Sequence, residues 1–347
     1  VTDVQRNPSL GMKGQGILIA VIDTGINYLH EAFIKQDKTT KITSIWDQTI
    51  NDAESATNEM GYGTIYSKDI INFALRSENP YSVVPTTDDT GHGTAIAGII
   101  AGNENKSENF SGVVPDAEFI IVKLKQAKKI TKEMFCISEN TVCYQETDVL
   151  FALNYAMQQA NILKKPLSIC IAIGTNQGSH DGRGILSSYL SEISNQAGMS
   201  VTIAAGNEGL TRKHHYGVLD PSVEPNEFQV RVGKNEYGFA MEIWKSSPYK
   251  ISVDITSPTG EYISQVYPTI RECRDFKFIF EPTTIWVDNS ITEATTGDQL
   301  ILVRCLLPTE GLWKFRIYNL DKESSDYHVW LPTEGIVSEE TYFINPN

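Results

Sequence analysis

The sequence predicts an α/β domain with a parallel sheet and flanking helices, followed by an antiparallel β-sandwich. Up to about residue 210, continuous apolar runs alternate with helical patterns, as they do in covered parallel sheets. From about residue 213, short β-branched or aromatic runs alternate with turn residues, which is typical of a sandwich. We therefore assign residues 1–212 to an α/β core, 213–336 to the sandwich and 337–347 to a return towards the core.

Within the core, apolar runs at 16–25, 166–174 and 200–209 predict buried strands. Residues 147–165 and 184–198 have apolar residues at i, i+3 and i+4, which predicts amphipathic helices. The small residues that follow His92 predict another helix, packed closely on the sheet. Because the interval from 23 to 92 is long for one crossover, we expect residues 44–75 to elaborate the rim of a cleft and to narrow access to it.

The sandwich is predicted from short runs that are separated by Gly, Pro, Asp and Asn. These runs are 249–257, 261–268, 276–281, 284–289, 299–308, 312–319 and 327–332. A carbohydrate-binding domain is an alternative, and it would need exposed tryptophans at Trp244, Trp286, Trp313 and Trp330. Tryptophans at strand spacing in apolar runs are more often core residues.

Composition excludes several classes of protein. The formal net charge of −14 argues against nucleic acid or an anionic membrane as the main partner. No apolar run is long enough to span a membrane, and residues 1–16 lack a signal-peptide pattern. The 5 cysteines have no CxxC spacing, which argues against a zinc site. A Cys136–Cys143 pair is conceivable, but unpaired thiols are favoured.

Polar residues follow strands or open a helix at three places in the core. Asp23 ends the first strand in DTG, His92 opens a helix in HGT, and Asn207 follows a strand in AAGNEG. Singly, the Asp could bind a ribose or a metal, the His could be a capping residue, and the Asn could be a turn residue. Together they place a carboxylate, an imidazole and a carboxamide at one sheet edge. Such a set can take a proton from a hydroxyl nucleophile and stabilise an oxyanion.

These motifs resemble those of the subtilisin-like serine proteases, the subtilases. VIDTGINYLH (21–30), GHGTAIAG (91–98) and AAGNEG (204–209) are similar to the family's aspartate, histidine and asparagine motifs, and GVVPDAEFIIVKL (112–124) is similar to the strand after the histidine helix. The resemblance implies a subtilisin-like core and serine-type endopeptidase activity. It implies that Asp23 is the orienting acid, His92 the general base and Asn207 the oxyanion donor.

The resemblance also implies a substrate-binding strand end at Ala172, Ile173 and Gly174, whose backbone would pair with the substrate. The family more often has Ser where Ala172 stands. SIWDQTI (44–50), YGTIYSKDIINFAL (62–75), VKLKQAKK (122–129) and GTNQGSHDG (174–182) resemble the clostridial germination-type subtilases. That group has a jelly-roll domain inserted between the asparagine and serine motifs. Some of its members process a spore cortex-lytic enzyme, and others have lost the triad and act in regulation.

The nucleophile is missing from this sequence. The family's serine lies in GTS at a helix start, and no such segment occurs; Ser168 and Ser179 fall on or just after the substrate strand. We therefore expect the serine in a downstream or separate segment, which would be a partner of this chain. The predicted function is limited proteolytic processing of a protein or peptide substrate through an acyl-enzyme. The alternative is a pseudoprotease that acts as a binding or signalling scaffold.

Other residues have weaker assignments. The chemistry requires no cofactor, and we predict no metal ligands, although the oxygen-rich loop 103–112 leaves calcium open. His214 and His215 are more consistent with a surface pair than with a metal site. Asp88 and Asp89 could cap the histidine helix or line a subsite for basic side chains. The loop 125–146, with Lys125, Lys128 and Lys129, either borders the cleft or is a solvated charge run. The resemblance implies an extracytoplasmic location, secreted or spore-associated.

Overall fold

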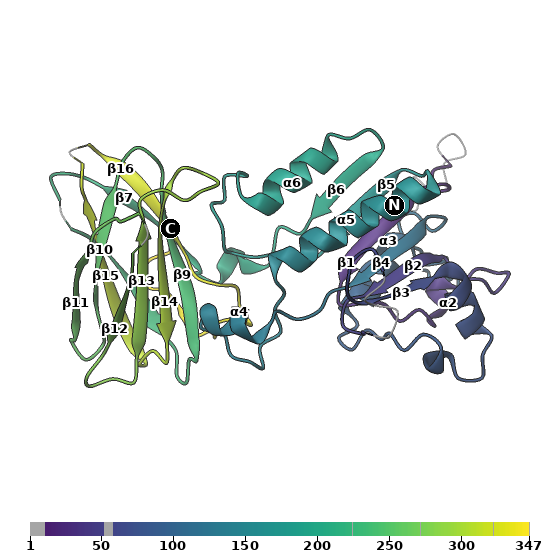
Figure 1. Cartoon of the computed structure of the whole chain (residues 1–347), viewed down its shortest axis with the longest axis horizontal. Helices are drawn as coiled ribbons and strands as arrows, with labels where there is room; N and C mark the ends of the chain where they lie inside the picture. Colours follow the sequence, from purple (N-terminus) through teal and green to yellow (C-terminus); the bar gives the residue numbers. More distant parts are fainter. Residues whose placement is uncertain (1–10, 52–57, 224, 271, 322, 347) are drawn as a thin grey trace. The chain divides into compact units, whose positions relative to one another are not determined.

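The computed structural model describes residues 11–51, 58–223, 225–270, 272–321 and 323–346, and the chain divides into two compact units (Figure 1). The core unit comprises Val1–Gln126, Tyr144–Gly174 and Tyr189–Ala205. The sandwich unit comprises Ala127–Cys143, Thr175–Ser188 and Gly206–Asn347. Two segments that precede the predicted boundary at residue 213 therefore fold with the sandwich. Residues 1–10, which are most of the segment 1–16 that lacks a signal-peptide pattern, lie outside the described part.

The core unit is built on a six-stranded sheet in the order β3-β2-β4-β1-β5-β6. Neighbouring strands are parallel except β2 and β3. The strands are β1 (Leu18–Asp23), β2 (Ile42–Asp47), β3 (Thr64–Ser67), β4 (Glu118–Lys123), β5 (Leu167–Ile171) and β6 (Met199–Ile203). All six residues of β1 are buried, as expected for a central strand of a sheet covered on both faces.

Helices pack against this sheet (Figure 1). Over the described residues, the chain's α-helices are α2 (Lys68–Leu75), α3 (His92–Ala101), α4 (Lys129–Met134), α5 (Glu146–Leu163) and α6 (Ile185–Ser194), and the short 3₁₀ helices are η1 (Glu31–Phe33), η3 (Pro80–Ser82) and η4 (Glu208–Leu210). Of these, α4 and η4 belong to the sandwich unit and not to the core. On one side, Val21 of β1 shares a hydrophobic cluster with Ala97 of α3. Helix α5 packs against β1, β4 and β5, and its Tyr155 contacts the ring of Trp46. The predicted α/β core with a parallel sheet is therefore confirmed.

The sandwich unit contains two antiparallel sheets, of order β11-β10-β15-β8-β17 and β12-β13-β14-β9-β16-β7. Their strands are β7 (His214–Leu219), β8 (Asn226–Val232), β9 (Gly238–Lys245), β10 (Ile251–Thr256), β11 (Tyr262–Val266), β12 (Cys273–Lys277), β13 (Thr284–Ser290), β14 (Gln299–Leu306), β15 (Gly311–Asn319), β16 (Ser325–Trp330) and β17 (Tyr342–Phe343). Alternate residues of both sheets, among them Phe228, Ile243 and Phe315, fill one hydrophobic core. The predicted antiparallel sandwich is confirmed.

Two expectations differ from the structure. Residues 44–75 were predicted to elaborate a cleft rim, but Ile42–Asp47 and Thr64–Ser67 are strands of the core sheet. Their apolar side chains, such as the fully buried Trp46, belong to the core packing. Residues 337–347 were predicted to return towards the core, but Tyr342–Phe343 pair with β8 of the sandwich, where Phe343 is buried in its hydrophobic core.

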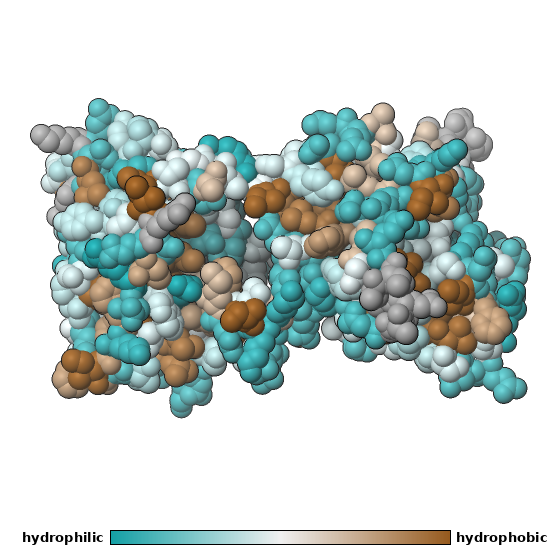
Figure 2. Space-filling model, in the orientation of Figure 1, coloured by the Kyte–Doolittle hydropathy of each residue, from teal (hydrophilic) through white to brown (hydrophobic). Residues whose placement is uncertain are grey.

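The face drawn in Figure 2 is mostly polar. Figure 2 shows hydrophilic residues over much of the visible face of both units, with apolar residues in smaller patches between them. In the part of the chain that the structure describes, no helix is long and apolar enough to cross a membrane. All five cysteines are free thiols, as the sequence favoured.

Candidate active site

The predicted acid and base lie against each other at the carboxyl end of β1. Asp23 is the last residue of β1 and His92 the first residue of α3. Nδ1 of His92 lies 2.7 Å from Oδ1 of Asp23, and the His92 side chain is 49% exposed whereas that of Asp23 is 1% exposed. Because an ionised carboxylate only accepts hydrogen bonds, Nδ1 of a neutral His92 donates and Nε2 is the basic nitrogen.

Two glycines allow α3 to approach β1 this closely. A Cβ on Gly93 would lie 2.2 Å from the carbonyl oxygen of Gly25 and 3.2 Å from Cβ of Asp23. Gly25 has a φ of +121°, and a Cβ there would lie 2.8 Å from the carbonyl oxygen of Thr87. The glycines of DTG and HGT are therefore required by packing, because side chains at these positions would separate the acid from the base.

A second carboxylate, Asp88, holds the first turn of α3. Its Oδ2 accepts hydrogen bonds from N (2.8 Å) and Oγ1 (2.6 Å) of Thr94, and its Oδ1 accepts from Oγ1 of Thr24 (2.8 Å) and N of Gly91 (3.0 Å). Burial raises the pKa of Asp88, but the bonds from Thr94, Thr24 and Gly91 outweigh it and lower that pKa. Asp88 thus has the capping role that the sequence allowed it.

Thr24 is a residue whose part in the site the sequence reasoning missed. Its Oγ1 accepts from the backbone N of Gly93 at 3.0 Å while donating to Asp88, and its own backbone N donates to Oδ1 of Asp23 at 2.7 Å. The threonine therefore connects the end of β1 with the start of α3. The only available signal was its place in DTG, directly after the acid. Oδ2 of Asp23 is buried and has no hydrogen-bond partner among the described residues.

The predicted substrate strand end lies at the same edge of the sheet as Asp23. Strand β5 pairs with β1 up to Ile171, which lies opposite Ile22, and with β6 up to the same residue. Ala172, Ile173 and Gly174 follow directly, beyond both ladders; the first two are half-buried and Gly174 is exposed. The strand ends three residues before the end of the predicted run 166–174, because the ladders end at Ile171. Substrate binding by residues 172–174 stays a prediction.

Asn207 is the N-cap residue of η4, in the segment after β6, and it is exposed. It falls in the sandwich unit, whereas Asp23 and His92 belong to the core unit. Its role as oxyanion donor therefore stays a prediction from its motif.

The side chains of His214 and His215 lie on opposite faces of β7, because side chains alternate along a strand. His215 is buried, and its Nδ1 lies 2.8 Å from the carbonyl oxygen of Asn345, whereas Nε2 of His214 lies 3.0 Å from Nδ1 of His328. Within the described ranges, no group of three or more His, Cys, Asp or Glu residues could hold a metal ion. In the loop 103–112, the Asn105 carboxamide accepts from the backbone and hydroxyl of Ser107. Calcium binding there stays a prediction.

The remaining assignments concern lysines and tryptophans. Lys125 contacts Asp148 at 2.7 Å and lies over the ring of Tyr62, so this lysine has partners within the core unit and is no solvated charge. Lys129 pairs with Glu139 at 3.4 Å. None of the four tryptophans of the sandwich is exposed: Trp244 and Trp313 are buried and Trp286 and Trp330 half-buried. A carbohydrate-binding surface of exposed tryptophans is therefore not present.

A buried carboxylate that orients a histidine at the end of a parallel strand is the proton-transfer pair of enzymes with a side-chain nucleophile. The fold and this pair together resemble the arrangement found in α/β hydrolytic enzymes. A sequence model described as the subtilase family (peptidase S8) matches residues 14–232, and the chain belongs to that family of serine peptidases. The predicted resemblance is confirmed.

Three relatives illustrate the similarity. The chain is 25% identical over 223 residues to the PII-type proteinase of Lacticaseibacillus paracasei, covering 60% of this chain and 10% of that relative. It is 32% identical over 119 residues to a C5a peptidase of Streptococcus pyogenes, covering 33% of this chain and 9% of that relative. The solved structure of the Clostridium perfringens CspB protease matches with a TM-score of 0.81 and 28% identity, covering 100% of this chain and 68% of that one. The chain thus spans about a tenth of the length of the curated relatives.

Proposed function

We propose that this chain bears the acid, base and oxyanion donor of a serine endopeptidase that cleaves peptide bonds through an acyl-enzyme. The observation that supports this best is the 2.7 Å contact between Nδ1 of a half-exposed His92 and Oδ1 of a buried Asp23. That contact fixes the imidazole tautomer and leaves Nε2 to take a proton.

In the proposed reaction, Nε2 of His92 takes the hydroxyl proton as the serine oxygen attacks the scissile carbonyl carbon. The Asp23 carboxylate stabilises the imidazolium that forms. The side-chain N–H of Asn207 donates to the oxyanion, in the manner of a carboxamide in an oxyanion hole. His92 then gives its proton to the leaving amine, and water attacks the acyl-enzyme with His92 again acting as base.

The serine itself is proposed to come from a segment outside this chain. Three observations support this. The sequence has no GTS motif at a helix start. The CspB protease chain extends beyond the part that this chain matches. Strand β6 forms one edge of the core sheet, and its Ile203 is 51% exposed. An exposed apolar edge strand is a place where another strand can pair.

The substrate is proposed to be a protein or peptide whose backbone pairs with residues 172–174, in limited processing of a protein partner. The mechanism needs no cofactor, and calcium at residues 103–112 would be structural. The proposed location is extracytoplasmic, either secreted or spore-associated.

The test is co-expression of this chain with the downstream segment of its own gene, followed by labelling with a fluorophosphonate probe. We expect the downstream segment to carry the label and the assembled protein to hydrolyse a peptide substrate. His92→Ala should abolish both, whereas His30→Gln, an exposed histidine that caps η1, should leave both unchanged. The isolated chain should be inert.

Two results would contradict the proposal. Peptide hydrolysis by the isolated chain that is lost in His92→Ala would place the nucleophile within this chain. A downstream segment without a serine at the motif position, and an assembled protein without labelling, would favour the pseudoprotease scaffold instead.

A further inference from the structure

The segment Thr175–Ser188 follows the predicted substrate strand end directly, yet it folds with the sandwich unit. The chain on both sides of it, Tyr144–Gly174 and Tyr189–Ala205, belongs to the core unit. Several contacts attach the segment to sandwich strands and their loops. They are distributed along the segment from Asn176 to Arg183.

The first attachment is made by Glu242 of β9, a carboxylate that is only 7% exposed. Its Oε2 accepts hydrogen bonds from the backbone N of Gly178 and from Nε1 of Trp244, both at 2.8 Å. Beside it, Nε2 of Gln177 donates to the carbonyl oxygen of Ala240 at 3.1 Å. Burial raises the pKa of Glu242. A buried carboxylate is costly unless it is hydrogen-bonded, so the Gly178 N–H is part of what stabilises it.

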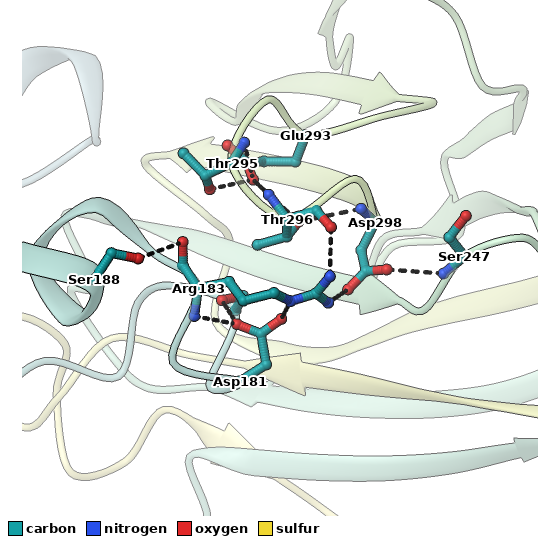
Figure 3. A network of polar contacts seen from close by, with 9 residues as sticks. Asp181, Arg183, Ser188, Ser247, Glu293, Thr295, Thr296 and Asp298 are labelled. Carbon is teal, nitrogen blue, oxygen red and sulfur yellow. Dashed lines mark hydrogen bonds and ion pairs between the residues drawn. The ribbon is translucent and has the colours of Figure 1, made fainter. Parts of the chain in front are cut away.

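The second attachment is Arg183, whose guanidinium bonds to three acceptors through three different nitrogens (Figure 3). Nε donates to Oδ2 of Asp181 at 2.5 Å, Nη1 to the carbonyl oxygen of Thr296 at 2.6 Å, and Nη2 to Oδ2 of Asp298 at 2.6 Å. The planar fork of an arginine suits such an arrangement, and a lysine could not reproduce it.

The acceptors of Arg183 are themselves fixed. In Figure 3, the Glu293 carboxylate closes the turn that presents the Thr296 carbonyl, accepting from the backbone N of Thr295 and of Thr296 at 2.9 Å each. Oδ1 of Asp298 accepts from the backbone N of Ser247 at 2.9 Å. Arg183 is half exposed, and an isolated pair at that exposure would contribute little. Arg183 instead donates to acceptors on another part of the chain that further hydrogen bonds already hold in place.

A third attachment is a ring stack made by His180, which lies between Gly178 and Arg183 in the sequence. The imidazole of His180 lies on the indole of Trp330, with ring centroids 3.7 Å apart and planes within 10°. On β16 the same indole also stacks with His214, at 3.9 Å. Over residues 176–183 the segment is therefore held by a buried carboxylate, a ring stack and an arginine fork.

We infer that Arg183 and Glu242 are positioning residues, through which the sandwich immobilises the segment after Gly174 and thereby the substrate strand end at residues 172–174. A strand end that continues into a fixed segment loses less entropy when a substrate pairs with it than one that continues into a free loop. The sandwich would then contribute to substrate affinity without touching the substrate. The effect on substrate affinity rests on the proposed function, whereas the immobilisation of the segment after Gly174 does not.

Amide hydrogen exchange of the intact chain, read by mass spectrometry, tests the immobilisation. In Arg183→Ala we expect several-fold faster exchange in peptides that cover residues 172–182, with the Gly178 amide as the most informative site. Exchange in β8 and β15 should not change. Arg183→Lys should fall between the wild type and Arg183→Ala. The matched control is Arg274→Ala, because Arg274 also pairs with an acidic residue two positions before it, Glu272.

Equal exchange over residues 172–182 in Arg183→Ala and the wild type would overturn the inference, and so would faster exchange confined to residues 181–188. If Arg183→Ala fails to fold, Asp298→Asn and Arg183→Lys are judged by the same regional criterion. In the assembled protease, Arg183→Ala should raise KM for a peptide several-fold with little change in kcat. A fall in kcat alone would contradict positioning of the substrate strand. If the wild-type assembly is inactive, the proposed function fails while the exchange result still decides the immobilisation.

Discussion

Substituting Gly93 by alanine should disrupt the contact between His92 and Asp23. The new Cβ would lie 2.2 Å from the carbonyl oxygen of Gly25, well inside the van der Waals contact distance. The clashing atom belongs to the backbone, so no side-chain rotation can relieve the overlap. Helix α3 must move away from β1 by roughly 1 Å, and the 2.7 Å contact between His92 and Asp23 lengthens with it.

The free energy of unfolding of the core unit should fall by about 3 kcal/mol, at the upper end of the 1–3 kcal/mol that overpacking usually costs. The cost is high because neither the Cβ nor the carbonyl oxygen can move without its backbone. The control is Gly98→Ala in the same helix, where a Cβ would have nothing within 4 Å. That change should stabilise the helix by about 1 kcal/mol, because alanine has the higher helix propensity.

The two units need not unfold together, so a single spectroscopic transition would mix them. Hydrogen exchange across a urea series, read in peptides from β1 and α3, follows the core unit alone. Gly93→Ala should lower the urea midpoint of those peptides and Gly98→Ala should raise it slightly. Equal midpoints for the two variants would refute the packing argument for the HGT glycine.

Three further predictions concern charged groups of the core unit. Asp88→Ala should destabilise α3 by about 1 kcal/mol in the same urea assay, since it removes the cap on the first turn. Burial alone would raise the pKa of Glu118, but its bonds to Lys165 and Lys68 outweigh this and lower it to about 2. The contribution of Glu118 to the free energy of unfolding, about 2 kcal/mol after allowing for screening, is therefore complete above pH 4.5 and lost as the pH falls towards 2. An acid titration of stability should show this loss in the wild type but not in Glu118→Gln. Burial lowers the pKa of Lys41 to about 8, so the folded state binds fewer protons than the unfolded state between pH 8 and 10.5. The stability of the wild type should therefore rise over that range relative to Lys41→Met. Parallel pH profiles of the two proteins would contradict this assignment.

Much of the fold and of the acid–base pair could be predicted from the sequence. The apolar run before Asp23 is typical of a buried strand, and such a strand places the carboxylate at its carboxyl end. The small residues after His92 predicted a helix that approaches the sheet, and Ala97 and Ala101 are fully buried there. What the motifs could not show is why their glycines are needed, since the overlap at Gly93 depends on a carbonyl from another segment.

Other features depend on contacts between segments that are distant in the chain. The doublet His214–His215 looked like one surface pair, but strand alternation sends His215 into the sandwich core and pairs His214 with His328, 114 residues away. Residues 175–188 were assigned to the core, as part of residues 1–212. Their attachment to Glu242 and Asp298 depends on side chains more than 60 residues further along, which no local pattern signals.

The sequence by itself determined the class of fold, the family and the expectation that Asp23 and His92 lie together, because periodicity and short motifs are properties of neighbouring residues. Only the tertiary structure decided that Thr24 and Asp88 join β1 to α3, which glycines the approach requires, and which unit holds the segment after Gly174. The physical reason is the same in each case. These features are set by distances between backbone and side-chain atoms of remote segments, and those distances exist only once both sheets have packed.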